Sequence, residues 1–89
     1  MIERELEIRN RLGLHARAAA RLVHITAPFT SSVTLAQNGE EVDAKSILGV
    51  LLLAAPQGSR VIVRCDGDDE SRAMRAIVDL FDDRFGEGE

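Results

Sequence analysis

The sequence contains no tryptophan and no tyrosine, and its three phenylalanines leave the aromatic content at 3%. The core of such a chain must therefore be aliphatic. Its 89 residues suffice for one domain, which we place at residues 1–89 with a frayed tail at 86–89. A domain of this size hides only about 60–65% of the surface of its unfolded chain, so we expect a thin core and no deep cleft for a small molecule.

The sequence is also poor in cysteine, long apolar runs and positive charge. One cysteine, Cys65, is too few for an internal disulfide or a cysteine-based metal site, and it suits a reducing compartment. No apolar run approaches the ~20 residues that span a bilayer, and residues 1–7 lack the apolar stretch of a signal peptide. We therefore expect a cytoplasmic monomer that binds no membrane directly and carries no metal or cofactor. The net charge of −4 argues against a general nucleic-acid binder.

The charge is unevenly distributed along the chain. Residues 1–27 carry a net charge of +2, residues 28–65 carry none and residues 66–89 carry −6. A basic front of this kind is typical of a surface that faces an anion. Solvated surface charge is the simpler interpretation of the same numbers.

Hydrophobic periodicity predicts seven elements. A period of two predicts strands over 2–8, 33–36, 40–43 and 60–65. A period of three to four predicts helices from about 15 to 27, from 46 to about 54, and from 68 or 69 to 85. A four-stranded sheet with the helices stacked on one face is the simplest arrangement that buries this aliphatic surface, and it makes the domain α+β.

Local signals predict where these elements begin and end. Asn38-Gly39 favours a two-residue hairpin turn between the second and third strands. Pro28 ends the first helix, because its ring keeps the preceding residue from staying helical. For the last helix, we expect Asp68 or Asp69 to accept the unpaired N–H groups at its start and Gly86 to close it.

His15 lies where a loop becomes the first helix, with Arg17 two positions later. The start of a helix carries unpaired N–H groups and about half a positive charge, so a neutral imidazole and a nearby anion are both favoured there. A phosphorylated ring would face those N–H groups and the planar donors of Arg17. On spacing alone, however, a surface histidine that merely starts a helix is the more common case.

Two segments carry a family resemblance, GLHARAA at residues 13–19 and AKSILGV at residues 44–50. The first resembles the active-centre signature of HPr, the family of histidine-containing phosphocarriers in the bacterial phosphotransferase system. The second resembles the regulatory-serine region of that family. Their separation, the chain length and the order of elements fit as well, so the resemblance covers essentially the whole chain. One difference is Ala18, where the family usually has proline; alanine is the best helix former, so the helix should be retained.

The resemblance implies a fold and a function. HPr proteins form an open-faced β-sandwich, in which three helices cover one side of an antiparallel four-stranded sheet in the order 1-4-2-3. By this resemblance His15 would take a phosphoryl group on Nδ1 from phosphorylated enzyme I and pass it to an enzyme IIA, while Arg17 would steady the phosphate. The protein would be a relay component and not an enzyme in its own right. Sugar-uptake and nitrogen-regulatory carriers share the pattern at residues 13–17, so the pathway stays open.

Ser46 has two interpretations. Its residue type and position favour an N-cap of the second helix. The resemblance adds phosphorylation by an HPr kinase/phosphorylase, which would place negative charge beside the surface that partners use. The alternative to a carrier is a regulatory adaptor that binds a kinase or transcription factor through Ser46 and the second helix. Relatives that act only in that way lack the active histidine, which this chain keeps.

The second helix is apolar on every side, although a sheet can cover only one face of it. Some of its side chains should therefore stay exposed, unless neighbouring loops cover them. We hypothesise a docking patch with an apolar half and a polar half. Its apolar half consists of Ile47, Leu48 and Leu51, and its polar half consists of Arg17, Arg21 and His24.

Overall fold

The computed structural model describes residues 1–88. Its strands are β1 (Ile2–Glu7), β2 (Ser32–Gln37), β3 (Glu40–Asp43) and β4 (Arg60–Asp66). Its α-helices are α1 (Ala16–Thr26), α2 (Ile47–Leu53) and α3 (Glu70–Asp82), and a short 3₁₀ turn, η1 (Arg84–Gly86), follows the last of them. No helix within residues 1–88 has the length and apolar composition needed to cross a membrane.

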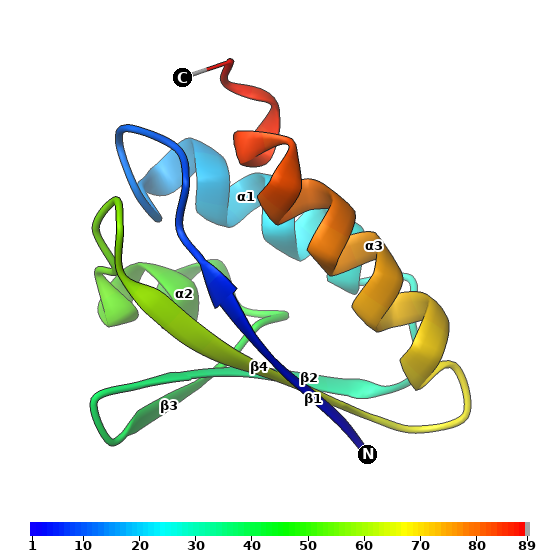
Figure 1. The fold of residues 1–89 in the computed structure, drawn as a ribbon. Coiled ribbons are helices and arrows are strands. Elements are labelled where there is room, and N and C mark those ends of the chain that lie inside the picture. Colours follow the sequence, from blue (N-terminus) through cyan, green and yellow to red (C-terminus); the bar gives the residue numbers. More distant parts are fainter. Residues whose placement is uncertain (89) are drawn as a thin grey trace.

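The four strands form one antiparallel sheet in the order β1-β4-β2-β3. The three helices lie on one face of this sheet and leave the other face open (Figure 1). The predicted open-faced α+β sandwich is therefore confirmed. The predicted hairpin is present as well, since Asn38 and Gly39 connect β2 to β3 with positive φ angles of 52° and 83°. Two consecutive residues with positive φ angles give the turn a twist that matches that of the flanking strands.

The core lies between the sheet and the helices and is almost entirely aliphatic. The strands contribute Val33, Leu35, Val61 and Val63, all at most 1% exposed. Cys65 is buried in the same layer, where desolvation raises the pKa of its thiol and keeps it protonated. It is an inert core residue, as small buried cysteines commonly are.

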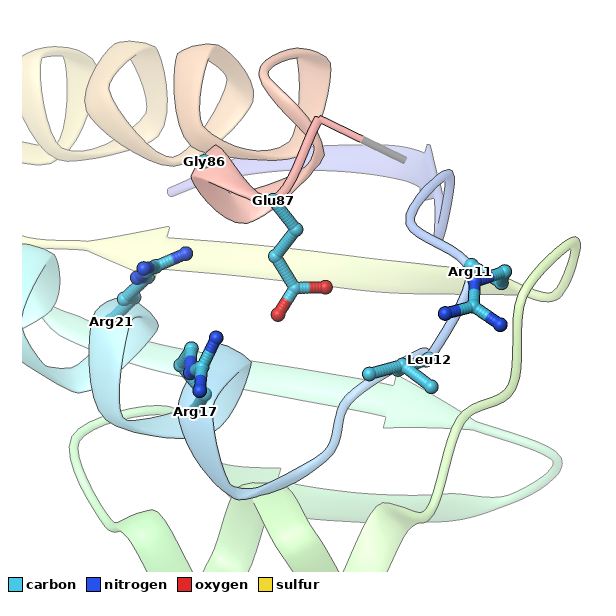
Figure 2. A pocket seen from close by; sticks show the side chains of 6 residues that line it. All are labelled: Arg11, Leu12, Arg17, Arg21, Gly86 and Glu87. Carbon is cyan, nitrogen blue, oxygen red and sulfur yellow. The ribbon is translucent and has the colours of Figure 1, made fainter.

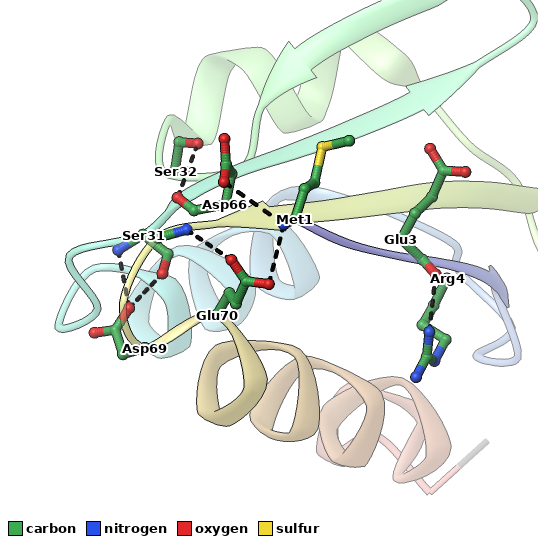
Figure 3. Close-up of polar contacts among 9 residues, drawn as sticks. Met1, Glu3, Arg4, Ser31, Ser32, Asp66, Asp69 and Glu70 are labelled. Carbon is green, nitrogen blue, oxygen red and sulfur yellow. Dashed lines mark hydrogen bonds and ion pairs between the residues drawn. The ribbon is translucent and has the colours of Figure 1, made fainter.

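The start of α3 differs from our expectation. Asp69 occupies the N-cap position, but its carboxylate accepts no hydrogen bond from the first turn of the helix. It turns instead to the loop before β2, where it accepts from the N–H of Ser31 at 3.0 Å and from the Ser31 hydroxyl (Figure 3). It also accepts from the N–H of Thr30 at 2.9 Å. The carboxylate thus joins two loops that are 38 positions apart.

The end of the chain also differs from our expectation. The helix α3 ends at Asp82, before Gly86 is reached, and Arg84 and Phe85 adopt left-handed φ angles of 53° and 55°. Phe85 is fully buried, with its ring centroid 4.8 Å from that of Phe81. This anchor directs the chain back across α1, so Gly86 belongs to η1 and Glu87 makes side-chain contacts instead of fraying. Residue 89, also predicted to fray, lies outside the described residues.

Candidate functional site

His15 is the N-cap of α1, with an extended backbone (φ −75°, ψ −180°) and a carbonyl oxygen that accepts the first helical hydrogen bond from Ala19 at 2.9 Å. Its ring turns back over the helix start, and Nδ1 accepts from the backbone N–H of Arg17 at 3.3 Å. The side chain is 26% exposed. Nδ1 therefore lies among the unpaired N–H groups of a helix terminus, which is the place that favours an anion.

The loop before His15 is held in place by hydrogen bonds. Leu14 donates its N–H to the carbonyl oxygen of Ala55 at 2.9 Å, and Gly13 adopts a left-handed φ of 67°. Asn10, fully buried, donates through Nδ2 to the carbonyl oxygen of Gly13 at 2.7 Å. The position of the imidazole thus depends on a buried side chain and on a segment about 40 residues further along.

The other ring nitrogen of His15, Nε2, contacts the carboxylate of Glu87. The same carboxylate accepts from Nδ2 of Asn10 at 2.9 Å, and the Glu87 side chain is only 10% exposed. Since Nδ1 already accepts from the N–H of Arg17, the proton of a neutral ring belongs on Nε2, where it is donated to Glu87. The contact fixes the tautomer in which Nδ1 carries the free electron pair.

Glu87 also lies among cations. It lines a pocket of about 240 Å³ together with residues of the loop, of α1 and of the tail, and its carboxylate points between the arginines (Figure 2). The remaining lining residues are Arg11, Leu12, Arg17, Arg21 and Gly86. Desolvation alone would raise the pKa of Glu87. Hydrogen bonds from Asn10 and His15, together with the charge of Arg21, outweigh it and lower the pKa, so the carboxylate is ionised at neutral pH.

Comparison with known proteins shows which family this chain belongs to. Residues 2–83 match the family described as "PTS HPr component phosphorylation site". The chain belongs to the HPr family. It is 55% identical to the phosphocarrier protein HPr of Xylella fastidiosa (strain Temecula1 / ATCC 700964) over 87 residues, which is 98% of each chain. It is 52% identical to the phosphocarrier protein HPr of Cupriavidus necator over 89 residues, which is all of both chains.

A solved structure shows the same fold. The HPr-C-His protein from Thermoanaerobacter tengcongensis superposes with a TM-score of 0.94 at 42% identity, with 98% of each chain covered. Membership of the family makes this chain a phosphocarrier of the phosphotransferase system and not a catalytic enzyme. Among residues 1–88 no cluster of three or more His, Cys, Asp or Glu side chains could hold a metal ion.

The residues predicted for the polar half of the docking patch lie on one face of α1. Arg17, Arg21 and His24 line a shallow hollow of about 320 Å³ that reaches Leu80 of α3. His24 is exposed in the last turn of α1. The fold of this HPr chain therefore brings the three predicted side chains to one surface.

The residues predicted for the apolar half lie on α2, which packs against α1. Ile47 is 42% exposed and Leu48 74% exposed, as predicted. Leu51, however, is half-buried and packs against the core, whereas Leu52 is 76% exposed. A helix that is apolar all round gives no sequence signal for its rotation, and here packing turns Leu52 outward.

Ser46 is the N-cap of α2, and its Oγ accepts from the N–H of Gly49 at 3.1 Å. The capping role expected from the residue type is therefore present. The exposed Ile47 and Leu48 follow Ser46 directly in the sequence.

Sequence reasoning missed Asn10 and Glu87. The only signal was the opposite net charge of residues 1–27, which are basic, and residues 66–89, which are acidic. It indicated that the basic segment faces an anion. In the structure, an anion that faces this basic segment is the carboxylate of Glu87, in the same chain.

Proposed function

We propose that His15 accepts a phosphoryl group on Nδ1 from phosphorylated enzyme I and passes it to an enzyme IIA. The observation that supports this most directly is the placement of Nδ1 against the N–H of Arg17 at the start of α1. Family membership identifies a phosphocarrier, and the contacts of the two ring nitrogens support Nδ1 as the one with the free electron pair.

In the first step the electron pair of Nδ1 attacks phosphorus, a phosphorus–nitrogen bond to His15 forms, and the bond between phosphorus and the donor breaks. The hydrogen bond from the backbone N–H of Arg17 is long at 3.3 Å, so a phosphoryl oxygen can replace Nδ1 as its acceptor when the new bond forms. The onward step reverses these changes: the electron pair returns to Nδ1 and the phosphoryl group moves to the acceptor.

Arginines stabilise the transferred group. Arg17 and Arg21 line the pocket beside the ring, and their guanidinium groups supply donors that suit phosphate oxygens. The ring is 26% exposed, which allows two different partners to reach it in turn.

Partners would bind through the docking patch. Arg17, Arg21 and His24 would contact acidic groups of enzyme I and enzyme IIA, and the exposed Ile47 and Leu48 would fill an apolar depression. We include Leu51 with a smaller contribution, because it is half-buried.

Ser46 would regulate this docking when an HPr kinase/phosphorylase phosphorylates it. A phosphate at the start of α2 is itself tolerated, because the helix terminus favours an anion. Its effect would fall on partners, since two negative charges would lie next to the apolar half of the patch.

Incubation with phosphoenolpyruvate and enzyme I tests the proposal. We expect one added phosphoryl mass that is stable in base, lost in acid and absent from His15→Ala. Acceptance by His15→Ala, or none by the wild type from either a sugar-type or a nitrogen-type enzyme I, would overturn it. The faster of the two donors identifies the pathway.

A further inference from the structure

We propose that Glu87 is a positioning residue for phosphoryl transfer: its carboxylate holds the Nε2 proton of His15, both in the free ring and in the phosphorylated ring. The inference rests on the proposed function of His15. It assigns a role to a carboxylate 72 positions away in the sequence, in a tail that the sequence alone predicts to be frayed.

The tail is built to reach the ring. Phe85 is fully buried, and its carbonyl oxygen accepts a hydrogen bond from the guanidinium of Arg21. The N–H groups of Gly86 and Glu87 then donate to the carbonyl oxygens of Asp83 at 2.9 Å and Arg84 at 3.1 Å. Left-handed backbone carries a conformational cost at both Arg84 and Phe85. Burial of an aromatic side chain is large enough to offset such a cost.

The carboxylate is held from both sides. Asn10 donates to one oxygen of Glu87, and Nε2 of His15 contacts the other. Asn10 is 0% exposed and also donates to Gly13, so its amide nitrogen has two acceptors and its orientation is fixed. Glu87 is therefore attached to the same buried side chain that fixes the loop before His15.

The contact has a chemical consequence for transfer. When Nδ1 attacks phosphorus while Nε2 keeps its proton, the ring becomes a cation. An ionised carboxylate on Nε2 stabilises that charge as it develops. When the phosphoryl group leaves again, Nδ1 takes back its electron pair and the ring returns to the neutral tautomer with its proton still on Nε2. No proton has to move in either step.

The proton on Nε2 also determines how readily the ring gives up its phosphoryl group. A protonated phosphoimidazole has a neutral imidazole as its leaving group, whereas the deprotonated ring would leave as an anion. The charged groups around the ring act in opposite directions. Arg11, Arg17 and Arg21 disfavour a second positive charge, and Glu87 is the carboxylate that lines the same pocket. Removing it should shift the balance toward the deprotonated, less reactive form.

The variants Glu87→Gln and Glu87→Ala test the inference. Glutamine keeps the volume of the side chain but replaces one acceptor oxygen by an amino group. That amino group would face a donor on either Asn10 or His15, so one of the two contacts is lost. Asp82→Asn is the control, because it removes one exposed negative charge from the same part of the chain. Thermal unfolding of each variant is measured alongside, and Glu87→Gln carries the test where Glu87→Ala weakens the fold.

Two readouts are combined. In the unphosphorylated protein, ¹⁵N-edited NMR should show a protected Nε2–H resonance that Glu87→Gln and Glu87→Ala lose and Asp82→Asn keeps. In the phosphorylated protein, ³¹P NMR should show that the pH at which the ring loses its Nε2 proton falls by about one unit in the Glu87 variants. Above the pH at which the wild-type phosphorylated ring loses its proton, onward transfer should be about tenfold slower in the Glu87 variants than in the wild type. At pH 6 the rates should be equal.

The two readouts separate this inference from the proposed function. Unchanged resonance and unchanged pH profile in both Glu87 variants would overturn the role of Glu87 while leaving His15 as the acceptor. A wild-type protein that accepts no phosphoryl group would overturn the proposed function and the transfer role together. The Nε2–H resonance requires no enzyme I and would still show whether the contact exists. A uniform loss of rate at every pH would indicate a merely structural tail and would also overturn the inference.

Discussion

The backbone N–H of Leu14 donates to the carbonyl oxygen of Ala55 at 2.9 Å, which connects the loop before His15 to the segment that follows α2. Gly13 makes this close approach possible. A Cβ atom at Gly13 would lie 2.5 Å from the oxygen of Ala55 and 3.0 Å from Cα of Pro56. Both are backbone atoms, which cannot turn aside as a flexible side chain can.

We therefore expect Gly13→Ala to destabilise the fold and displace His15. A left-handed alanine costs about 1 kcal/mol, and overlap with packed atoms adds roughly 1–3 kcal/mol. The free energy of unfolding, measured by urea denaturation, should fall by roughly 2–4 kcal/mol, and phosphoryl acceptance should slow in the fraction that stays folded.

Gly39→Ala is the matched control for Gly13→Ala. Gly39 has a positive φ of 83° but nothing within 4 Å of an added Cβ. Its substitution should cost only the conformational part, about 1 kcal/mol. Equal losses at the two positions would show that the approach to Ala55 does not constrain the loop.

Substitutions of Ser46 should separate capping from charge. Ser46→Ala loses the hydrogen bond from Gly49 and should lower the free energy of unfolding by about 1 kcal/mol. Asparagine and aspartate both cap helices well, so Ser46→Asn and Ser46→Asp should retain stability. Only Ser46→Asp should slow phosphoryl transfer from enzyme I, since it alone adds charge beside the docking patch. Equal transfer rates for Ser46→Asn and Ser46→Asp would contradict the proposed regulation.

The sequence predicts those parts of the molecule that local physics determines. Val33 and Leu35 alternate with polar neighbours and lie in a strand, and Asn38-Gly39 forms the expected turn because few other dipeptides accept its backbone angles. The start of α1 at His15 is a local feature of the same kind. The functional role of His15 and Arg17, in contrast, was predicted from the family resemblance, because spacing alone favoured a surface histidine.

Three features could not be predicted, because distant parts of the chain determine them. The carboxylate of Asp69 has a choice between its own helix and the N–H groups of Thr30 and Ser31, and the loop packing decides it. The rotation of α2, which exposes Leu52, depends on how the helix packs against its neighbours. The contact between Glu87 and His15 depends on the direction in which η1 leaves α3.

The exposure of Leu48 gives a test of the docking patch. Leu48→Glu should weaken binding to enzyme I about tenfold or more, because it replaces a side chain that is 74% exposed by a charged one at the centre of the apolar half. Ser71→Glu adds the same charge at an exposed position on α3 and should leave the affinity unchanged. Isothermal titration calorimetry measures both, and similar affinities for the two variants would exclude α2 from the interface.

Asp69 should make the stability of the fold depend on pH. Hydrogen bonds from the Ser31 hydroxyl and from the N–H groups of Thr30 and Ser31 outweigh desolvation and hold the pKa of Asp69 well below its ordinary value. A carboxyl group whose pKa is lower in the folded state stabilises the fold above its unfolded pKa of about 3.9, and this contribution is lost as the pH falls toward the folded value.

We therefore expect Asp69→Asn to unfold at a lower urea concentration than the wild type at pH 7, and the difference to shrink as the pH is lowered from 5 to 2. An asparagine cannot accept the three hydrogen bonds with a full negative charge, whereas at low pH the protonated Asp69 loses that advantage as well. Asp68→Asn, at the exposed neighbouring position, should follow the wild type at every pH. A difference between Asp69→Asn and the wild type that stays constant from pH 7 to pH 2 would show that the two loops are joined by shape and not by the charge of this carboxylate.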